Sequence, residues 1–141
     1  MRALKAVASS AVIIFGATSA AAYCDSFPAV EQEFKTSAIV FVGKLTSAKE
    51  VPSQGGFIRG TFYSVKVAQT LKGSPSNKVE LCENSSGRFP MRVGVQYLVF
   101  ADYGVFEAIS GERLAIDNCG NSAPLSKAHK ALGILRRLTK T

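Results

Sequence analysis

Short apolar runs alternate with turn residues along most of the chain, a pattern typical of β-strands. Residues 38–46 form a β-branched and aromatic run with the composition of a buried strand. Residues 57–71 alternate between two sides, which predicts a second strand. The side that we expect to face the core carries Tyr63, Val65 and Val67. Gly60 lies inside this segment and predicts a bend or a bulge.

Shorter elements continue the pattern toward the C-terminus. We expect turns at residues 51–56, 72–77 and 102–104. We expect further strands at residues 79–82, 95–101, 105–109 and 114–116. Pro28 and the acidic residues after it predict a short helix over residues 28–34. Leucine and alanine at helical spacing predict a second helix over residues 125–138, with Ser122 and Pro124 at its start.

These elements predict a mainly β fold, a five- to six-stranded Greek-key barrel of the OB type with a short N-terminal helix and a C-terminal helix. A two-sheet sandwich fits the pattern nearly as well. The chain shows no internal repeat, linker or change of composition, and its 141 residues suit one folded domain.

The first 22 residues have the pattern of a secretory signal peptide. Two basic residues precede an apolar stretch over residues 6–17, which is too short to span a bilayer. We therefore predict cleavage after Ala22, a mature domain over residues 23–141, and export to the periplasm or the extracellular space without a transmembrane segment. A buried N-terminal helix is the alternative. A lipoprotein anchored at Cys24 is disfavoured because Tyr23, the residue before it, is large.

The composition argues against most enzyme classes. The chain has one histidine, His129, so a catalytic zinc site or a Ser-His-Asp triad would have to rely on it alone. No phosphate-binding loop of the GxxxxGK[ST] type occurs, which argues against nucleotide hydrolysis. The late carboxylates Glu107, Glu112 and Asp117 would need a cleft for acid–base chemistry, and we interpret them as surface charges. We therefore expect no catalytic residue, no metal site and no cofactor.

Positive charge predominates, with 17 Lys and Arg against 10 Asp and Glu and a formal net charge of +7. The basic residues on or beside the C-terminal helix are Lys127, Lys130, Arg136, Arg137 and Lys140. They form either a contact surface for an anionic partner or a solvated face that complements the helix C-terminus.

OB folds also bind single-stranded nucleic acid through a basic groove and exposed aromatic side chains. The aromatic residues here lie inside strand patterns, and we interpret most of them as core: Phe41, Phe62, Tyr63, Tyr97 and Phe100. We therefore expect no nucleic-acid partner.

The order of these features resembles a known family. The residues that carry the resemblance are Cys24, Phe34, Ser37–Lys44, Tyr63–Val67, Leu71–Gly73, Gly94–Ala101, Cys119 and Pro124–Leu125. In this order and spacing they are similar to bacterial netrin-like domains, which are also described as tissue-inhibitor-of-metalloproteinases-like. The resemblance covers nearly the whole mature chain and implies an OB barrel.

Animal members of this family inhibit zinc proteases. The resemblance therefore implies that this chain inhibits a zinc metalloendopeptidase through its N-terminal edge, which consists of Tyr23, Cys24, Asp25 and Ser26. We expect this edge to lie next to the loop around residues 52–57, and we expect a monomer. In the animal inhibitors the first residue is a cysteine whose amine and carbonyl bind the protease zinc, whereas the predicted start here is Tyr23. The alternative is a non-inhibitory exported module that contacts an envelope component through the basic C-terminal helix.

Three cysteines allow three single bridges and leave one thiol over. The resemblance implies a Cys24–Cys119 disulfide, which would join the N-terminal segment to the loop before the last helix. A Cys24–Cys82 bridge is the alternative. If Cys82 stays unpaired, it is either a buried inert thiol, which we favour, or a thiol that reacts or bridges to another chain.

Overall fold

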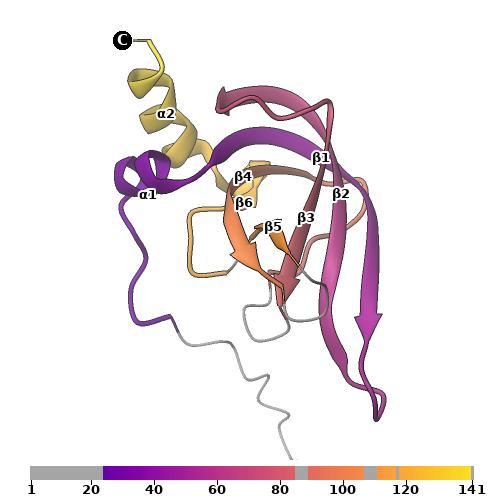
Figure 1. The fold of residues 1–141 in the computed structure, drawn as a ribbon. Helices are drawn as coiled ribbons and strands as arrows, with labels where there is room; N and C mark the ends of the chain where they lie inside the picture. The colour runs from indigo at the N-terminus through magenta and orange to yellow at the C-terminus, as the bar shows by residue number, and fades with distance from the viewer. Residues whose placement is uncertain (1–23, 85–88, 107–110, 117, 141) are drawn as a thin grey trace, which may run out of the picture.

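The computed structural model describes residues 24–84, 89–106, 111–116 and 118–140, and in this part of the chain the fold is mainly β (Figure 1). The elements are α1 (Val30–Thr36), β1 (Ile39–Pro52), β2 (Ile58–Lys72), β3 (Lys78–Asn84), β4 (Gln96–Val105), β5 (Glu112–Ala115), β6 (Ala123–Pro124), the 3₁₀-helix η2 (Leu125–Lys127) and α2 (His129–Leu138). The predicted mainly β class, the short N-terminal helix and the C-terminal helix are confirmed. No helix among the described residues is both long enough and apolar enough to cross a membrane.

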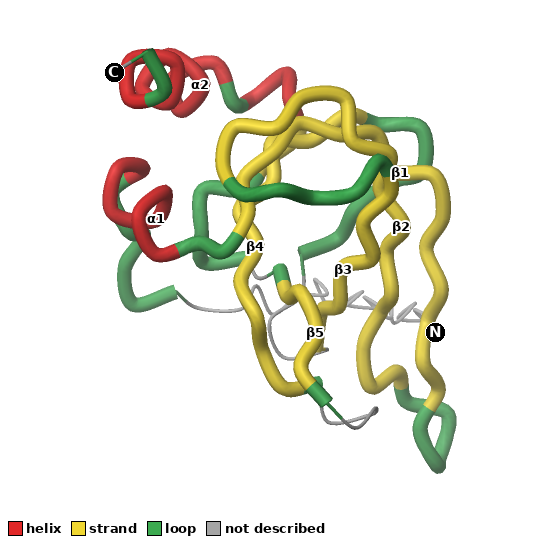
Figure 2. The backbone as a smooth tube through the Cα atoms, turned by 45° about the horizontal axis from the view of Figure 1, so that its top comes forward, coloured by secondary structure: helices red, strands yellow, loops and turns green. Residues whose placement is uncertain are grey.

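The strands form one six-stranded mixed sheet in the order β1-β2-β3-β5-β4-β6. Strand β1 has two partners, because Ile39–Lys44 also pairs antiparallel with Gln96–Ala101 of β4. Strands β3 and β5 meet in parallel where Cys82 pairs with Ala115. Figure 2 shows α1 and α2 together on one side of the strands, while the β1–β2 hairpin extends in the opposite direction.

Two hydrophobic clusters lie on the two faces of β1 and β4. The first cluster contains Ile39, Phe41, Leu45, Tyr63, Val65, Val79, Leu81, Met91, Tyr97, Val99, Ala101 and Ile116. The second cluster lies beneath the helices and contains Val40, Val42, Leu98, Phe100, Ala128, Leu132 and Leu135. Because successive side chains of a strand point to opposite faces, a strand that is covered on both faces needs an unbroken apolar run. This requirement explains the unbroken apolar composition of residues 38–43.

The residues predicted to face the core are largely confirmed. Tyr63 and Val65 are buried, and Val67 is half-buried against the same cluster. Among the aromatic residues interpreted as core, the exception is Phe62, which is only half-buried and packs on Phe106 with 5.2 Å between ring centroids.

Gly60 lies at a β-bulge, as predicted. Val51 pairs with Gly60 and Pro52 with Ile58, so Arg59 is the extra residue on β2. Gly60 also pairs with Asn84 of β3. A Cβ atom at this position would collide with the Glu83 carbonyl oxygen and would lie 2.6 Å from the Phe106 ring. Glycine is therefore required here by close packing of three segments.

The turn predicted at residues 51–56 begins too early, and the turn predicted at residues 102–104 is wrong. Strand β1 continues through Val51 and Pro52, and strand β4 continues through residues 102–104. In both places cross-strand pairing overrides the local turn preference, since Gly104 pairs with Arg113 and Val51 with Gly60. The strand expected at residues 105–109 falls mostly outside the described residues.

The C-terminal helix begins later than predicted. Residues 125–127 form a 3₁₀ turn, and α2 starts at His129. Ser122 does not cap the helix; its hydroxyl oxygen accepts a hydrogen bond of 2.9 Å from the Phe100 backbone N–H. This hydrogen bond continues the antiparallel pairing of β4 with β6, in which Leu98 lies opposite Ala123.

Candidate functional site

The N-terminal segment is covalently attached to the loop before β6. Cys24 and Cys119 form a disulfide with 5.5 Å between their Cα atoms, although 95 positions separate them in the sequence. The pairing implied by the family resemblance is confirmed, and the Cys24–Cys82 alternative is wrong. Cys82 is a free, buried thiol.

A second attachment lies around Asn121, two positions after Cys119. The side-chain amide of Asn121 donates to the Pro28 carbonyl oxygen at 2.9 Å and to Glu33 Oε2 at 2.6 Å. The Asn121 backbone N–H donates to the same carboxylate oxygen at 2.7 Å. Gly120 must lack a side chain, because a Cβ atom there would collide with the Glu33 carboxylate. Glu33 on α1 therefore holds the loop that follows Cys119.

The other end of α1 is fixed by Lys72 at the end of β2. Its ammonium group donates to the carbonyl oxygens of Phe34 and Lys35, both at 2.7 Å, and lies 5.7 Å from the centroid of the Phe34 ring. These contacts satisfy carbonyl groups at the helix C-terminus, which have no partner within the helix. Gly73 then turns away with φ of +78°, leaving no space for a Cβ atom beside the Ala38 carbonyl oxygen.

Between the Cys24–Cys119 disulfide and the Asn121–Pro28 hydrogen bond, a short stretch of chain faces solvent. Cys24 is half-buried, and Asp25, Ser26 and Phe27 are exposed, with 64% of Phe27 accessible. Tyr23, the first residue of the N-terminal edge, lies outside the described residues. Residues 24–28 thus form an exposed segment that is held at both ends.

The loop around residues 52–57, which we expected beside this edge, does not lie there. The tip of the β1–β2 hairpin, around residues 52–57, lies far from residues 24–28 in both views (Figures 1 and 2). The prediction that this loop flanks the edge is wrong because β1 and β2 run on as a long hairpin away from the helices. The hairpin tip carries its own exposed apolar side chains, Phe57 and Ile58.

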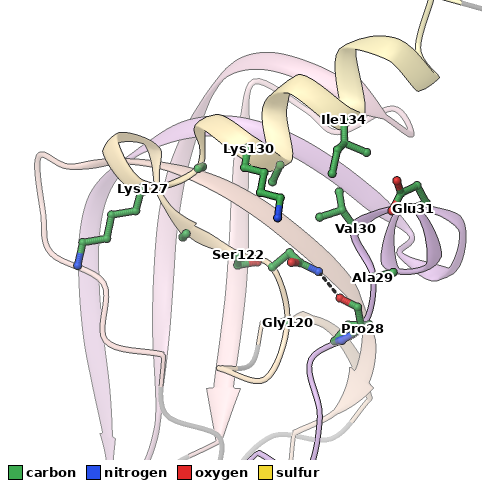
Figure 3. A pocket seen from close by; sticks show the side chains of 13 residues that line it. Pro28, Ala29, Val30, Glu31, Gly120, Ser122, Lys127, Lys130 and Ile134 are labelled. Carbon is green, nitrogen blue, oxygen red and sulfur yellow. Dashed lines mark hydrogen bonds between the residues drawn. The ribbon is translucent and has the colours of Figure 1, made fainter.

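A groove lies beside the edge, between the start of α1 and α2 (Figure 3). We call it the α1–α2 groove; its volume is about 520 Å³. It is lined by Pro28, Ala29, Val30, Glu31, Gly120, Asn121, Ser122, Ala123, Lys127, Ala128, Lys130, Ala131 and Ile134. The same Asn121–Pro28 hydrogen bond that fixes the edge therefore also fixes one wall of the groove.

The remaining candidate residues are dispersed. His129 is exposed at the start of α2, and Glu112 is exposed on β5; Glu107 and Asp117 lie outside the described residues. In the described ranges, no three His, Cys, Asp or Glu side chains gather as metal ligands would. The five basic residues, Lys127, Lys130, Arg136, Arg137 and Lys140, are all exposed.

A buried polar network, which the sequence did not reveal, lies at the far end of β3. The Tyr63 hydroxyl donates to Glu83 Oε1 at 3.1 Å, and the Phe89 backbone N–H donates to Glu83 Oε2 at 2.6 Å. Burial and the nearby negative charge of Glu83 raise the pKa of Tyr63 to about 12. Glu83 is 2% exposed, so this carboxylate holds the chain on both sides of residues 85–88 in place.

Cys82 lies next to this network. Burial, with a smaller effect from the charge of Glu80, raises the pKa of its thiol to about 11. The thiolate is the reactive form of cysteine, so this side chain is protonated and unreactive at neutral pH. Its environment supports the interpretation of Cys82 as an inert core residue.

Comparison with known proteins adds no identification: no family model matches the chain, and no curated protein matches it significantly. The functional argument therefore rests on the geometry of the edge, the groove and the basic helix.

Proposed function

We propose that the chain is an exported netrin-like domain whose sheet closes into a barrel of the OB type. The pairings of β1 with β4 and of β3 with β5 support closure, since the order β1-β2-β3-β5-β4 leads back to β1. The Cys24–Cys119 disulfide supports export, because disulfides persist mainly in oxidising compartments.

We further propose that the domain inhibits a zinc metalloendopeptidase through its N-terminal edge. The observation that supports this is the fixation of an exposed segment at Cys24 and at Pro28. A segment that is ordered before binding loses little conformational entropy when it docks. Phe27 follows the edge directly and offers an exposed aromatic side chain for a protease subsite.

The inhibitory chemistry would come from main-chain atoms. A catalytic zinc ion keeps one coordination position open for water or substrate. A neutral α-amine and the carbonyl oxygen of the same residue can together occupy the zinc in a five-membered chelate, and only the first residue of a chain offers both groups. In the predicted mature protein this residue is Tyr23; trimming by one residue would transfer the role to Cys24, whose backbone is fixed by the disulfide.

The experiment compares two purified forms, one beginning at Tyr23 and one beginning at Cys24. Each is titrated against a panel of zinc metalloproteases, and residual peptidase activity is measured. We expect stronger inhibition by the Cys24 form, and an added alanine before Cys24 should abolish it. Equal inhibition by both forms would show that the first amine is not the zinc ligand.

The basic surface on and beside α2 supports a second function, binding of an anionic envelope component. The five basic side chains are exposed, and the chain carries a formal net charge of +7. Binding through these charges should weaken steeply with added salt, because screening reduces interactions between exposed charges. If neither N-terminal form inhibits any protease but both bind a polyanion in this salt-dependent way, the second function replaces the first.

A further inference from the structure

The α1–α2 groove combines an apolar end with a positive charge. In Figure 3, Val30 of α1 and Ile134 of α2 approach each other at one end of the groove. Both side chains are half-buried, as is Ala131, which also lines the groove. Lys130 extends from α2 toward the loop that carries Gly120 and Ser122.

Charge is distributed unequally along the groove. Lys130 directs a positive charge into the groove, whereas the Lys127 side chain extends away from the other lining residues. Glu31 is the acidic residue of the lining and lies near Ile134. A ligand with one carboxylate near Lys130 and an apolar group between Val30 and Ile134 matches this arrangement. A second carboxylate at the apolar end would be repelled by Glu31.

We propose that the α1–α2 groove binds the C-terminal end of a peptide whose last side chain is apolar. The terminal carboxylate pairs with the Lys130 ammonium, and the last side chain packs between Val30 and Ile134. A charge-assisted hydrogen bond of this kind is stronger than a neutral one and fixes the direction of the bound chain. The groove volume of about 520 Å³ lies in the range usual for binding sites of small ligands.

The lining favours a peptide over an alkyl carboxylate. Ala29, Gly120 and Ala123 leave the main chain close to the surface of the groove, so N–H and C=O groups of a bound peptide have backbone neighbours. The groove is open to solvent along one side, so a long alkyl chain would remain partly in water and lose much of its burial free energy. This proposal does not depend on protease inhibition, because none of the described edge residues, Cys24, Asp25 and Ser26, lines the groove.

The test is titration of the isotope-labelled protein with an acetylated tetrapeptide that ends in leucine, followed by nuclear magnetic resonance. The free-acid peptide should shift the amide signals of residues 29–31, 120–123 and 130–134 in a saturable way. The same peptide with a C-terminal amide should bind about tenfold more weakly, since it lacks the charge that Lys130 pairs with. Decanoate serves as the alkyl carboxylate and should bind more weakly than the free-acid peptide.

Two variants separate the groove from general charge effects. Lys130→Gln should weaken binding of the free-acid peptide about tenfold and should leave the binding of the amide peptide unchanged. Arg136→Gln removes an exposed charge from the same helix outside the groove lining and should change neither. Equal binding of acid and amide peptides, equal weakening by both substitutions, tighter binding of decanoate, or no saturable shift at millimolar peptide would each overturn the proposal.

Discussion

The side-chain amide of Asn121 donates a hydrogen bond to the Pro28 carbonyl oxygen, 93 positions earlier in the chain. The Cys24–Cys119 disulfide joins the same two segments, four positions before Pro28 and two positions before Asn121. The N-terminal segment and the loop after β5 are therefore attached at both ends of a short exposed stretch. This double attachment distinguishes the edge from an ordinary chain terminus, which is usually poorly ordered.

Loss of the disulfide should destabilise the protein substantially. Cys24→Ser or Cys119→Ser opens a loop of 95 residues and should lower the free energy of unfolding by about 2–5 kcal/mol, as measured by chemical denaturation. Cys82→Ala is the matched control and should leave the bridge intact. Peptide mapping under non-reducing conditions that finds Cys82 bonded to either partner would contradict this assignment.

Asn121→Ala should weaken the second attachment. The substitution removes the side-chain bonds to Pro28 and Glu33 and leaves a half-buried carboxylate with fewer donors, so we expect a loss of about 1–3 kcal/mol in unfolding free energy. Hydrogen exchange of the Glu33 backbone amide, which donates to the Ala29 carbonyl oxygen beside this attachment, should accelerate. The control is Glu31→Gln, which changes an exposed residue of α1, the helix that carries Glu33. It should alter the free energy of unfolding by less than about 0.5 kcal/mol. Unchanged exchange in Asn121→Ala would mean that the disulfide alone holds the segment.

Two glycine substitutions should have opposite effects. Gly60→Ala forces a methyl group against the Glu83 carbonyl oxygen and the Phe106 ring and should cost about 1–3 kcal/mol or more. Gly133→Ala, inside α2, meets no atom within 4 Å and should raise stability by about 0.5–1 kcal/mol through higher helix propensity. Thermal unfolding of both variants tests these two expectations. Unchanged stability of Gly60→Ala would show that the bulge can widen to admit a methyl group.

Stability should fall at alkaline pH because of two buried acids. The folded-state pKa values of Cys82 and Tyr63 are raised to about 11 and about 12, from ordinary values of 9.0 and 10.0. The folded protein binds these protons more tightly than the unfolded chain, so the stabilisation is complete below pH 9 and is lost as pH rises to about 12. Denaturation midpoints measured across this range check the loss. In a Tyr63→Phe and Cys82→Ala double variant, the denaturation midpoint should fall less steeply with pH over this range. An equally steep fall would assign the loss of stability to other groups.

Local signals predicted the elements better than their connections. The β-branched and aromatic run of residues 38–46 predicted a buried strand because that pattern depends only on neighbouring positions. Turn signals at residues 102–104 failed, since pairing of β4 with β5 is a long-range effect that outweighs local preference. The family resemblance, rather than spacing, led to the Cys24–Cys119 pair.

The contacts that shape the site left no comparable signal. Glu33 and Asn121 are 88 positions apart, and neither residue type predicts a partner at that distance. The sequence around Lys72 and Gly73 predicts a turn, but it does not indicate that Lys72 satisfies the C-terminal carbonyl groups of α1. Such contacts depend on how the finished sheet brings α1 beside β2 and the loop after β5.

The central claim is that a fixed N-terminal edge binds a protease zinc through its first residue. The most direct measurement is the inhibition constant of the Cys24-start form and of the Tyr23-start form against the same zinc metalloproteases. We expect clear inhibition by the Cys24 form and weak or no inhibition by the Tyr23 form. Equal inhibition constants for the two forms, or no inhibition by the Cys24 form with its disulfide intact, would contradict it.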